Sequence, residues 1–141
     1  MAVVNILLVE DDEVDVMAVK RALKELKIAN PVFRVADGIA ALEILRGENG
    51  KEPMPHPFVI LLDLNMPRMG GLEFLDVLRG DPVLQRSIVF VMTTSTAEDD
   101  RFRAYDRHIA GYVLKSSCAR TFLEAVTMLE HYWRVIEFPQ L

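Results

Sequence analysis

Polar side chains stand at the ends of several apolar segments in this sequence. The first segment, residues 3–9, runs straight into three acids, and the segment that starts at residue 58 closes with a single aspartate. Two further segments end in hydroxyl groups and in an amine. In chain order these residues are Glu10, Asp11 and Asp12, then Asp63, then Thr93 and Thr94, and then Lys115.

The acids pose an electrostatic question, because carboxylates that crowd together raise one another's pKa. A divalent cation removes this repulsion, and oxygen ligands without histidine or cysteine select Mg²⁺ or Mn²⁺ over zinc. We therefore expect a magnesium or manganese site where these strand ends meet. Asp12 is better placed in the first turn of the following helix, where the helix dipole favours an acid.

The hydroxyl and the amine indicate a phosphoryl ligand. A Mg²⁺ ion held by few carboxylates keeps open positions that commonly take phosphate oxygens. Lys115 offers a positive charge and Thr93 a hydroxyl donor. The sequence contains neither GxxxxGK[ST] nor GxGxxG, so a nucleotide is not the obvious ligand. Asp63 closes an otherwise apolar strand and is the best nucleophile candidate, because a carboxylate can attack phosphorus and form an acyl phosphate.

Strand and helix patterns alternate along the whole chain. The expected strands cover residues 3–9, 31–36, 58–64, 87–94 and 111–115, and the expected helices cover 13–26, 39–47, 72–80, 97–108 and 116–138. In the first helix the pattern places Val14, Met17, Ala18, Arg21 and Ala22 on one side. Five strand–helix units predict an α/β fold with a doubly wound parallel sheet. Such sheets bind ligands at the carboxyl ends of their strands.

Length and composition limit the classes of protein. The 141 residues suit one domain, and a net charge of −5 disfavours binding to nucleic acid. Cys118 is the only cysteine, so an internal disulfide is excluded. No apolar run approaches the roughly 20 residues needed to span a bilayer, and the start lacks a basic signal region. We expect a cytoplasmic domain that does not contact membranes.

Four motifs together resemble the receiver domain of two-component response regulators, with CheY as the archetype. They are LLVEDD, LLDLNMPRMGG, VMTT and GYVLK, and the resemblance covers nearly the whole chain. It implies a flavodoxin-like fold with strand order 2-1-3-4-5. It also implies a single receiver domain over residues 1–141, with an extended C-terminal helix and a short tail, in which Asp63 accepts a phosphoryl group from a sensor histidine kinase.

The resemblance also implies roles for the other site residues. Asp11 is the expected direct Mg²⁺ ligand beside Asp63, Glu10 is expected to act on the metal through water, and Asn65 is expected to offer its backbone carbonyl. Thr93 and Lys115 are expected to bind phosphate oxygens. Tyr112 is expected to change rotamer on activation.

Finer features are similar to the Rcp1-like regulators that are paired with bacterial phytochromes. These features are the TTS after the fourth strand, the long loop before the third strand, the serine after Lys115, and the tail HYWRVIEFPQL. The common family pattern has a proline after the lysine, often with a cis bond, whereas this chain has Ser116. A cis bond before a residue other than proline costs about 2.5–4 kcal/mol, so the sequence leaves the isomer of the Lys115–Ser116 bond open.

Two other classes of function compete with this interpretation. Haloacid-dehalogenase-like phosphatases also use a strand-end aspartate with Mg²⁺, but they carry a second aspartate two residues later, where this chain has Asn65. An amide cannot act as the general acid, so we expect a phosphoacceptor with at most slow self-dephosphorylation rather than an enzyme. The third class is a dimeric scaffold whose binding does not depend on phosphorylation.

The end of the chain favours a symmetric homodimer. The last helix carries more apolar residues than one buried stripe requires, namely Phe122, Val126, Leu129, Tyr132, Trp133 and Ile136. A second buried face would account for the excess. The expected interface combines the fourth helix, the fifth strand, the final helix and the C-terminal tail, which could cross to the other subunit.

Overall fold

The structure is a computed structural model that describes residues 3–115 and 119–141. The strands are β1 (Asn5–Val9), β2 (Val32–Val35), β3 (Phe58–Leu62), β4 (Ile88–Thr93) and β5 (Gly111–Leu114). The helices are α1 (Glu13–Glu25), α2 (Gly38–Arg46), α3 (Gly71–Gly80), α4 (Glu98–Asp106) and α5 (Ala119–Val135). The expected serine N-cap of the last helix, at Ser116 or Ser117, lies outside the described residues.

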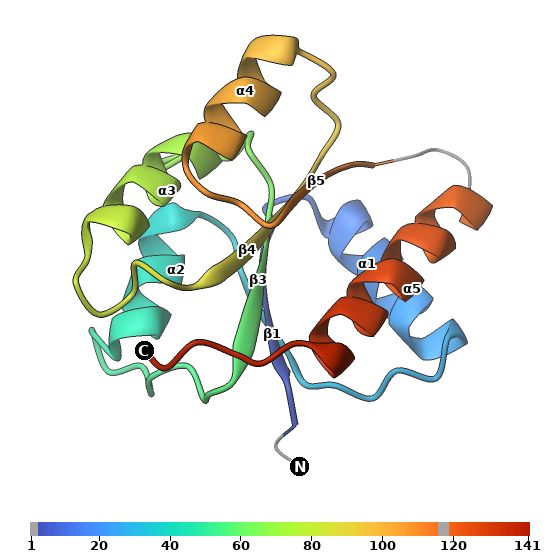
Figure 1. The fold of residues 1–141 in the computed structure, drawn as a ribbon, viewed down its shortest axis with the longest axis horizontal. Coiled ribbons are helices and arrows are strands. Elements are labelled where there is room, and N and C mark those ends of the chain that lie inside the picture. The colour runs from blue at the N-terminus through green and yellow to red at the C-terminus, as the bar shows by residue number, and fades with distance from the viewer. Residues whose placement is uncertain (1–2, 116–118) are drawn as a thin grey trace.

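The five strands form one parallel sheet in the order β2-β1-β3-β4-β5, which confirms the predicted topology. Helices α1 and α5 cover one face, and α2 and α3 cover the other, while α4 lies beside α3 near the β5 edge (Figure 1). Helices on both faces explain why β1 and β3 are apolar throughout, since successive side chains of a strand point to opposite faces.

Two apolar cores result from this alternation. Leu7 and Val9 of β1 point into the core under α2 and α3, whereas Ile6 and Leu8 point into the core under α1 and α5. The same division separates the side chains of β3 and β4. Because both faces are buried, the side chains that each strand packs into the two cores specify the strand register.

The register brings the strand ends to a common edge. Val9 of β1 pairs with Leu62 of β3, so that Glu10 and Asp63 follow directly at the same level. Asp63 donates its backbone N–H to the carbonyl of Val9 at 3.0 Å. At the β4–β5 pair, the backbone N–H of Lys115 reaches the carbonyl of Thr93 at 2.8 Å. The chain leaves β1 towards one face and β3 towards the other, which is the topological switch point where ligands bind.

The side of the first helix that the sequence pattern marks, with Val14 and Met17, is not the side that packs on the core. Val14 is 75% exposed and Met17 is 55% exposed, whereas Val16, Val19, Ala22 and Leu23 are buried. The stripe formed by Val16, Val19 and Leu23 has the larger apolar volume of the two, and the helix turns this side to the core. Val14 and Met17 therefore lie on the surface of α1.

Helix α5 packs through Val126, Leu129 and Trp133, all of which are buried. Tyr132 meets Phe90 of β4 edge-to-face, with ring centroids 4.9 Å apart. The helix ends at Val135, earlier than the sequence predicts, and the tail then runs along the edge of the sheet opposite the strand-end acids (Figure 1). Phe138 packs on the α1/α5 core and Leu141 on the α2/α3 core. In this structure the tail lies against its own domain.

Among the described residues, no helix combines the length and the apolar character needed to cross a bilayer.

Candidate functional site

The three acids after β1 diverge into different positions. Glu10 is buried and accepts a hydrogen bond from the backbone N–H of Asp12 at 3.1 Å. Asp11 is exposed at the rim. Asp12 is the N-cap of α1, and its Oδ1 accepts from the backbone N–H groups of Val14 at 2.8 Å and Asp15 at 3.3 Å. The prediction that Asp12 serves the helix start is confirmed, because a capping oxygen satisfies N–H groups that have no partner within the helix.

Arg34 of β2 holds the turn that carries these acids. Its Nε donates to the carbonyl of Glu10 at 2.9 Å, and its Nη2 donates to the carbonyl of Asp11 at 3.3 Å. Its Nη1 also forms an ion pair with Glu13 at 2.6 Å. The backbone that presents Glu10 and Asp11 is thereby fixed to the neighbouring strand.

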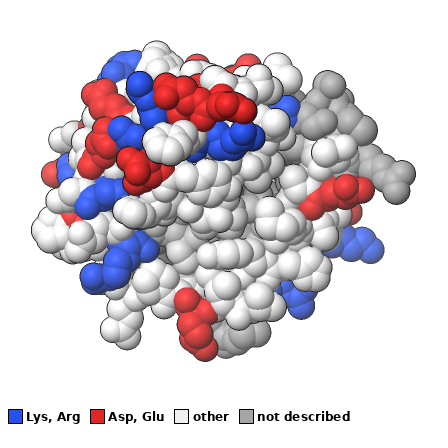
Figure 2. Space-filling model, turned by 45° about the horizontal axis from the view of Figure 1, so that its top comes forward, with Lys and Arg blue, Asp and Glu red and all other residues white. Residues whose placement is uncertain are grey.

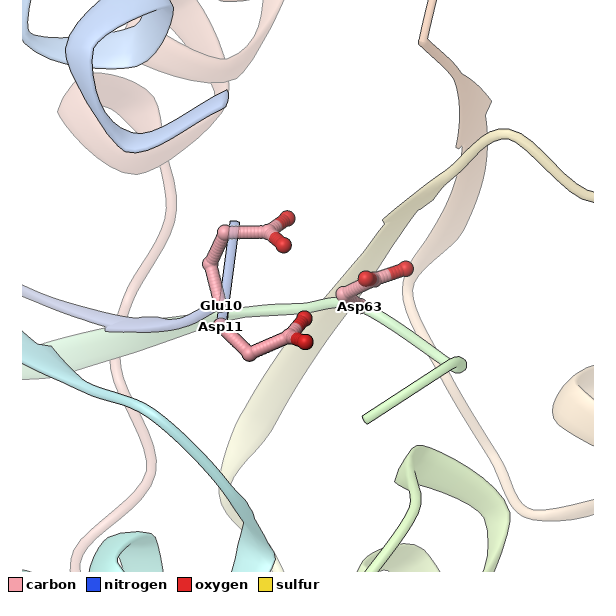
Figure 3. Close-up of side chains that lie close together, drawn as sticks. All are labelled: Glu10, Asp11 and Asp63. Atoms are coloured by element: carbon pink, nitrogen blue, oxygen red, sulfur yellow. The ribbon is translucent and has the colours of Figure 1, made fainter. Parts of the chain in front are cut away.

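Glu10, Asp11 and Asp63 bring one carboxylate oxygen each to within 4.8 Å of one another (Figure 3). Burial raises the pKa of Glu10 to about 7, against hydrogen bonds from Lys115 and from the Asp12 backbone that lower it, and the nearby Asp63 raises it further. These carboxylates fit Mg²⁺ or Mn²⁺, because hard oxygen ligands and negative charge are what such ions bind. The predicted metal cluster is confirmed as a group of side chains that lie together.

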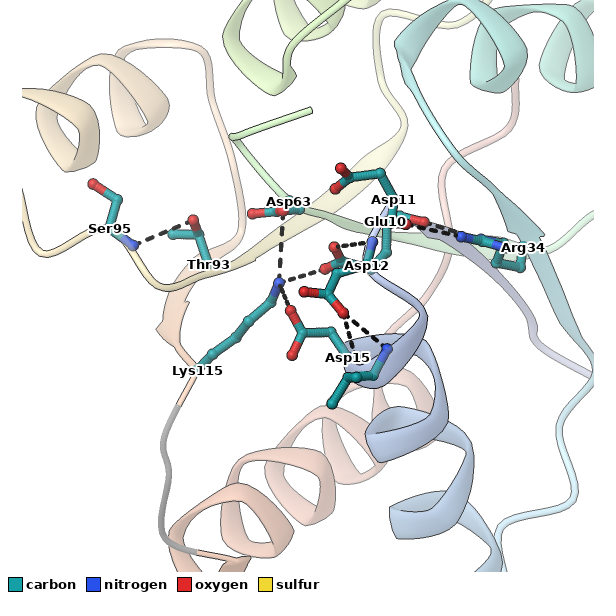
Figure 4. A network of polar contacts seen from close by, with 10 residues as sticks. Glu10, Asp11, Asp12, Asp15, Arg34, Asp63, Thr93, Ser95 and Lys115 are labelled. Carbon is teal, nitrogen blue, oxygen red and sulfur yellow. Dashed lines mark hydrogen bonds and ion pairs between the residues drawn. The ribbon is translucent and has the colours of Figure 1, made fainter. Parts of the chain in front are cut away.

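Lys115 reaches across from the end of β5 to the same acids (Figure 4). Its Nζ hydrogen-bonds to Oε2 of Glu10, lies 2.9 Å from Oδ2 of Asp15, and lies 3.6 Å from Oδ2 of Asp63. Burial alone would lower the pKa of Lys115, but the hydrogen bonds to Glu10 and Asp15 outweigh it and hold that pKa above its ordinary value. The lysine is therefore a positively charged group beside Asp63.

Thr93 is fully buried at the end of β4, the strand that pairs with β3. Its Oγ1 accepts a hydrogen bond from the backbone N–H of Ser95 at 3.4 Å. Tyr112 of β5 donates from its hydroxyl to the carbonyl of Ser95 at 2.9 Å. The two predicted switch residues, Thr93 and Tyr112, are thus connected through Ser95, whose own hydroxyl reaches Asp100 of α4 at 2.6 Å.

The backbone at Gly71, where the loop after β3 ends, packs against the backbone of Asp63 and Leu64, which leaves no room for a side chain at Gly71. A Cβ there would stand 2.5 Å from the carbonyl oxygen of Asp63 and 2.8 Å from Cα of Leu64. The backbone N–H of Gly71 closes the loop on the carbonyl of Leu64 at 3.0 Å. Asn65 is exposed within this loop, two residues after Asp63.

Two features of the site were missed in the sequence. Asp15 lies in the first turn of α1 and binds Lys115, although 100 residues separate them. Asp37, the N-cap of α2, forms a paired hydrogen bond with Arg68 in the loop after β3. The spacing of Asp15 from Asp12 indicates only the first turn of a helix, and neither residue pair leaves a local signal in the sequence.

Some predicted positions lie elsewhere. Thr94 is exposed and turned away from the buried Thr93, consistent with a turn hydroxyl. The Lys115–Ser116 bond and Cys118 lie outside the described residues.

Comparisons with known proteins agree with this geometry. A family model described as the response regulator receiver domain matches residues 6–127. Response regulator Rcp1 of Synechocystis sp. is 38% identical over 128 residues, covering 91% of this chain and 87% of that protein.

Solved structures give the same result. The phosphorylated cyanobacterial phytochrome response regulator RcpA superposes with a TM-score of 0.89 at 36% identity, covering 99% of this chain and 100% of that chain. The Mn²⁺-bound form of Rcp1 superposes with a TM-score of 0.85 at 36% identity, covering 98% and 99% respectively. The cluster of Glu10, Asp11 and Asp63 is that of a receiver metal site. This chain belongs to the response regulator receiver domain family, a family of phosphoacceptors rather than enzymes, and within it resembles Rcp1 and RcpA.

Proposed function

We propose that residues 1–141 form a single cytoplasmic receiver domain in which Asp63 accepts a phosphoryl group from a sensor histidine kinase of the bacterial phytochrome class. One observation carries this proposal: the Asp63 carboxylate lies close to the carboxylates of Glu10 and Asp11 and also close to the ammonium of Lys115. The phytochrome class rests on the likeness to RcpA, described as a phytochrome response regulator, and to a response regulator in red light signalling of R. palustris (TM-score 0.87, 27% identity).

The reaction needs little from the protein beyond positioning and charge. A carboxylate oxygen of Asp63 gives an electron pair to phosphorus, and the phosphorus–nitrogen bond to the kinase histidine breaks, with its electron pair returning to the imidazole ring. Lys115 and the Thr93 hydroxyl face phosphoryl oxygens. Asp11 and Asp63, with the Asn65 carbonyl and, through water, Glu10, would hold a divalent cation, which would supply charge that offsets the negative phosphoryl oxygens.

The aspartyl phosphate is expected to persist for a useful time. Asn65 stands where a phosphatase of the haloacid-dehalogenase type has its second aspartate, and an amide cannot serve as general acid or base. Hydrolysis then depends on water reaching phosphorus without protein assistance. A chromogenic phosphomonoester should accordingly show no multiple turnover.

Output is proposed to pass through the surface formed by α4, β5 and α5. Thr93 accepts a hydrogen bond from the backbone of Ser95, and the Tyr112 hydroxyl donates to the carbonyl of Ser95. A phosphoryl group that hydrogen-bonds to the Thr93 hydroxyl therefore alters the hydrogen bond that holds Tyr112. Phe102, Tyr105 and Leu114 are 72%, 49% and 45% exposed on this surface. Figure 2 shows charged side chains gathered towards the upper left, around α4, beside a broad uncharged area. Phosphorylation of Asp63 can shift the equilibrium between two conformations of this surface.

We propose that the same surface forms a symmetric homodimer, together with the C-terminal tail. Sedimentation velocity with and without beryllofluoride, comparing wild type with Phe102→Asp, tests this. A weight-average mass that rises with concentration in the wild type and not in the variant is expected. A wild-type monomer at every concentration, in both states, would contradict it.

The decisive experiment is phosphorylation by acetyl phosphate with Mg²⁺, followed by intact mass. The wild type should gain a phosphoryl mass that hydroxylamine removes, and Asp63→Asn should gain none. Phosphorylation of the Asp63→Asn variant to the wild-type level would refute the assignment. Transfer from a phosphorylated bacterial phytochrome, set against transfer from an unrelated histidine kinase, then tests the partner.

A further inference from the structure

Asp15 is an acid that touches the site but holds none of the roles described above. It lies in the first turn of α1, its side chain is 32% exposed, and its Oδ2 lies 2.9 Å from Nζ of Lys115. Asp63 is further from the same nitrogen, at 3.6 Å. Lys115 therefore makes hydrogen bonds to Glu10 and Asp15, and its distance to Asp63 exceeds that of a hydrogen bond.

We propose that Asp15 is a positioning residue that competes with the phosphoryl group on Asp63 for the ammonium of Lys115. This inference rests on the proposed function, since it concerns the same phosphoryl transfer. It differs from the metal site, because Asp15 contacts the lysine and lies outside the carboxylate cluster that gathers around Asp63.

The physical argument begins with the number of donors on the lysine. An ammonium has three N–H groups and three directions in which it can donate. Glu10 and Asp15 take two of these directions. A phosphoryl group on Asp63 brings strongly accepting oxygens to the third side, and the ammonium must move towards them to make charge-assisted bonds of normal length. That movement weakens the contact with Asp15.

Charge acts in the same direction as geometry. Asp15 is a negative group bound to the lysine that must neutralise the phosphoryl oxygens. Its carboxylate reduces the positive charge that Lys115 presents to Asp63, and it also repels an added anion directly. Removing the charge of Asp15 should therefore favour every state in which an anionic group sits on Asp63.

Asp15 also lines a cavity between α1 and α5. The cavity has a volume of about 260 Å³ and is lined by Asp15, Arg21 and Lys115, with Phe122 and Leu123 of α5 opposite. The position of Asp15 thus connects an accessible surface with the lysine of the phosphoryl site.

The test uses Asp15→Asn, with Asp12→Asn as its matched control. Both substitutions remove one negative charge from the start of α1, and an asparagine at position 12 retains the capping oxygen. Of these two acids, Asp15 is the one that hydrogen-bonds to Lys115. The conservative variant Asp15→Glu keeps the charge. The affinity for beryllofluoride with Mg²⁺ is measured by fluorine NMR titration for all four proteins, after urea unfolding has shown that each is folded.

Asp15→Asn should bind beryllofluoride about three- to fivefold more tightly than wild type, the upper part of the range that a partly exposed ion pair supports. Asp12→Asn and Asp15→Glu should remain within about twofold of wild type. If Asp15 had only a structural role, Asp15→Asn would not bind beryllofluoride more tightly than wild type while Asp15→Glu kept the wild-type affinity. Equal affinities for Asp15→Asn and Asp12→Asn, or weaker binding by Asp15→Asn, would overturn the competition.

Failure of the proposed function is separately visible. If wild type gains no phosphoryl mass from acetyl phosphate, the receiver chemistry itself is wrong. If wild type is labelled and Asp15→Asn matches Asp12→Asn in beryllofluoride affinity, only the role of Asp15 is refuted.

Discussion

Arg68 meets Asp37 with two nitrogens, Nε at 2.8 Å from Oδ2 and Nη2 at 3.0 Å from Oδ1. The pair joins the loop after β3 to the start of α2, next to a backbone bond of 3.1 Å from Gly38 N–H to the carbonyl of Met69. Arg68 also adopts a left-handed backbone, with φ of 61°, which a non-glycine residue adopts only where its surroundings hold it. The pair therefore stabilises the loop that begins after Asp63.

The ion pair between Arg68 and Asp37 should make the free energy of unfolding depend on pH. The hydrogen bonds from Arg68 hold the pKa of Asp37 below its usual range. A carboxyl with a lowered folded-state pKa stabilises the protein fully above its unfolded pKa of about 3.9 and loses that contribution as pH falls further. Asp37→Asn should cost about 0.5–1 kcal/mol at pH 7, allowing for the exposed arginine, and less at pH 3. Urea unfolding at both pH values checks this, and the same loss at both would contradict it. Asp106→Asn, at an exposed acid on α4, is the control.

Gly71 and Gly80 offer a matched pair of alanine substitutions at the two ends of α3. A Cβ at Gly71 would overlap the backbone of Asp63 and Leu64, whereas a Cβ at Gly80 meets nothing within 4 Å. Gly71→Ala should destabilise by about 1–3 kcal/mol and reduce phosphorylation, because the backbone of Asp63 must shift. Gly80→Ala should stabilise by up to about 1 kcal/mol. Denaturant unfolding measures both, and equal effects would show that the close approach at Gly71 is not real.

Divalent cations should stabilise the fold through Asp11. A ligand that binds only the folded state adds about 2.7 kcal/mol at a concentration 100 times its Kd. Thermal unfolding in Mg²⁺ and in EDTA should therefore differ for the wild type and much less for Asp11→Asn. Asp12→Asn should respond like wild type, because Asp12 caps α1 and stands outside the cluster. A full Mg²⁺ response in Asp11→Asn would remove Asp11 from the metal site.

Tyr112→Phe should separate phosphorylation from output. The substitution removes the hydrogen bond to the carbonyl of Ser95, at a cost of about 0.5–1.5 kcal/mol, and leaves the carboxylates untouched. Labelling by acetyl phosphate should match wild type, while the NMR shift changes that beryllofluoride causes in β5 and α4 should shrink. Tyr105→Phe, which loses a 3.2 Å bond from the Tyr112 backbone N–H, controls for the loss of a tyrosine hydroxyl on the same surface. Unchanged shift changes in Tyr112→Phe would exclude the tyrosine from the switch.

The sequence alone determined the fold and the centre of the site. Its alternation of apolar strands and helices requires a parallel sheet, and parallel strands present their carboxyl ends at one edge, so Glu10, Asp11, Asp63, Thr93 and Lys115 had to converge. The side chains that act on the centre from other elements could not be found in this way. Asp15 contacts Lys115 across 100 residues of chain, and Arg68 contacts Asp37 across 31.

The tertiary structure also decided which faces are buried. Two stripes of apolar residues compete on α1, and only packing against β1, β3 and α5 selected Val16, Val19 and Leu23 over Val14 and Met17. The tail FPQL carries no periodic pattern, and its course followed from the apolar surfaces that Phe138 and Leu141 could cover. Local pattern fixes what a segment becomes, because backbone geometry repeats within it. Which partners a segment meets depends on distant residues, because those contacts exist only once the chain has folded.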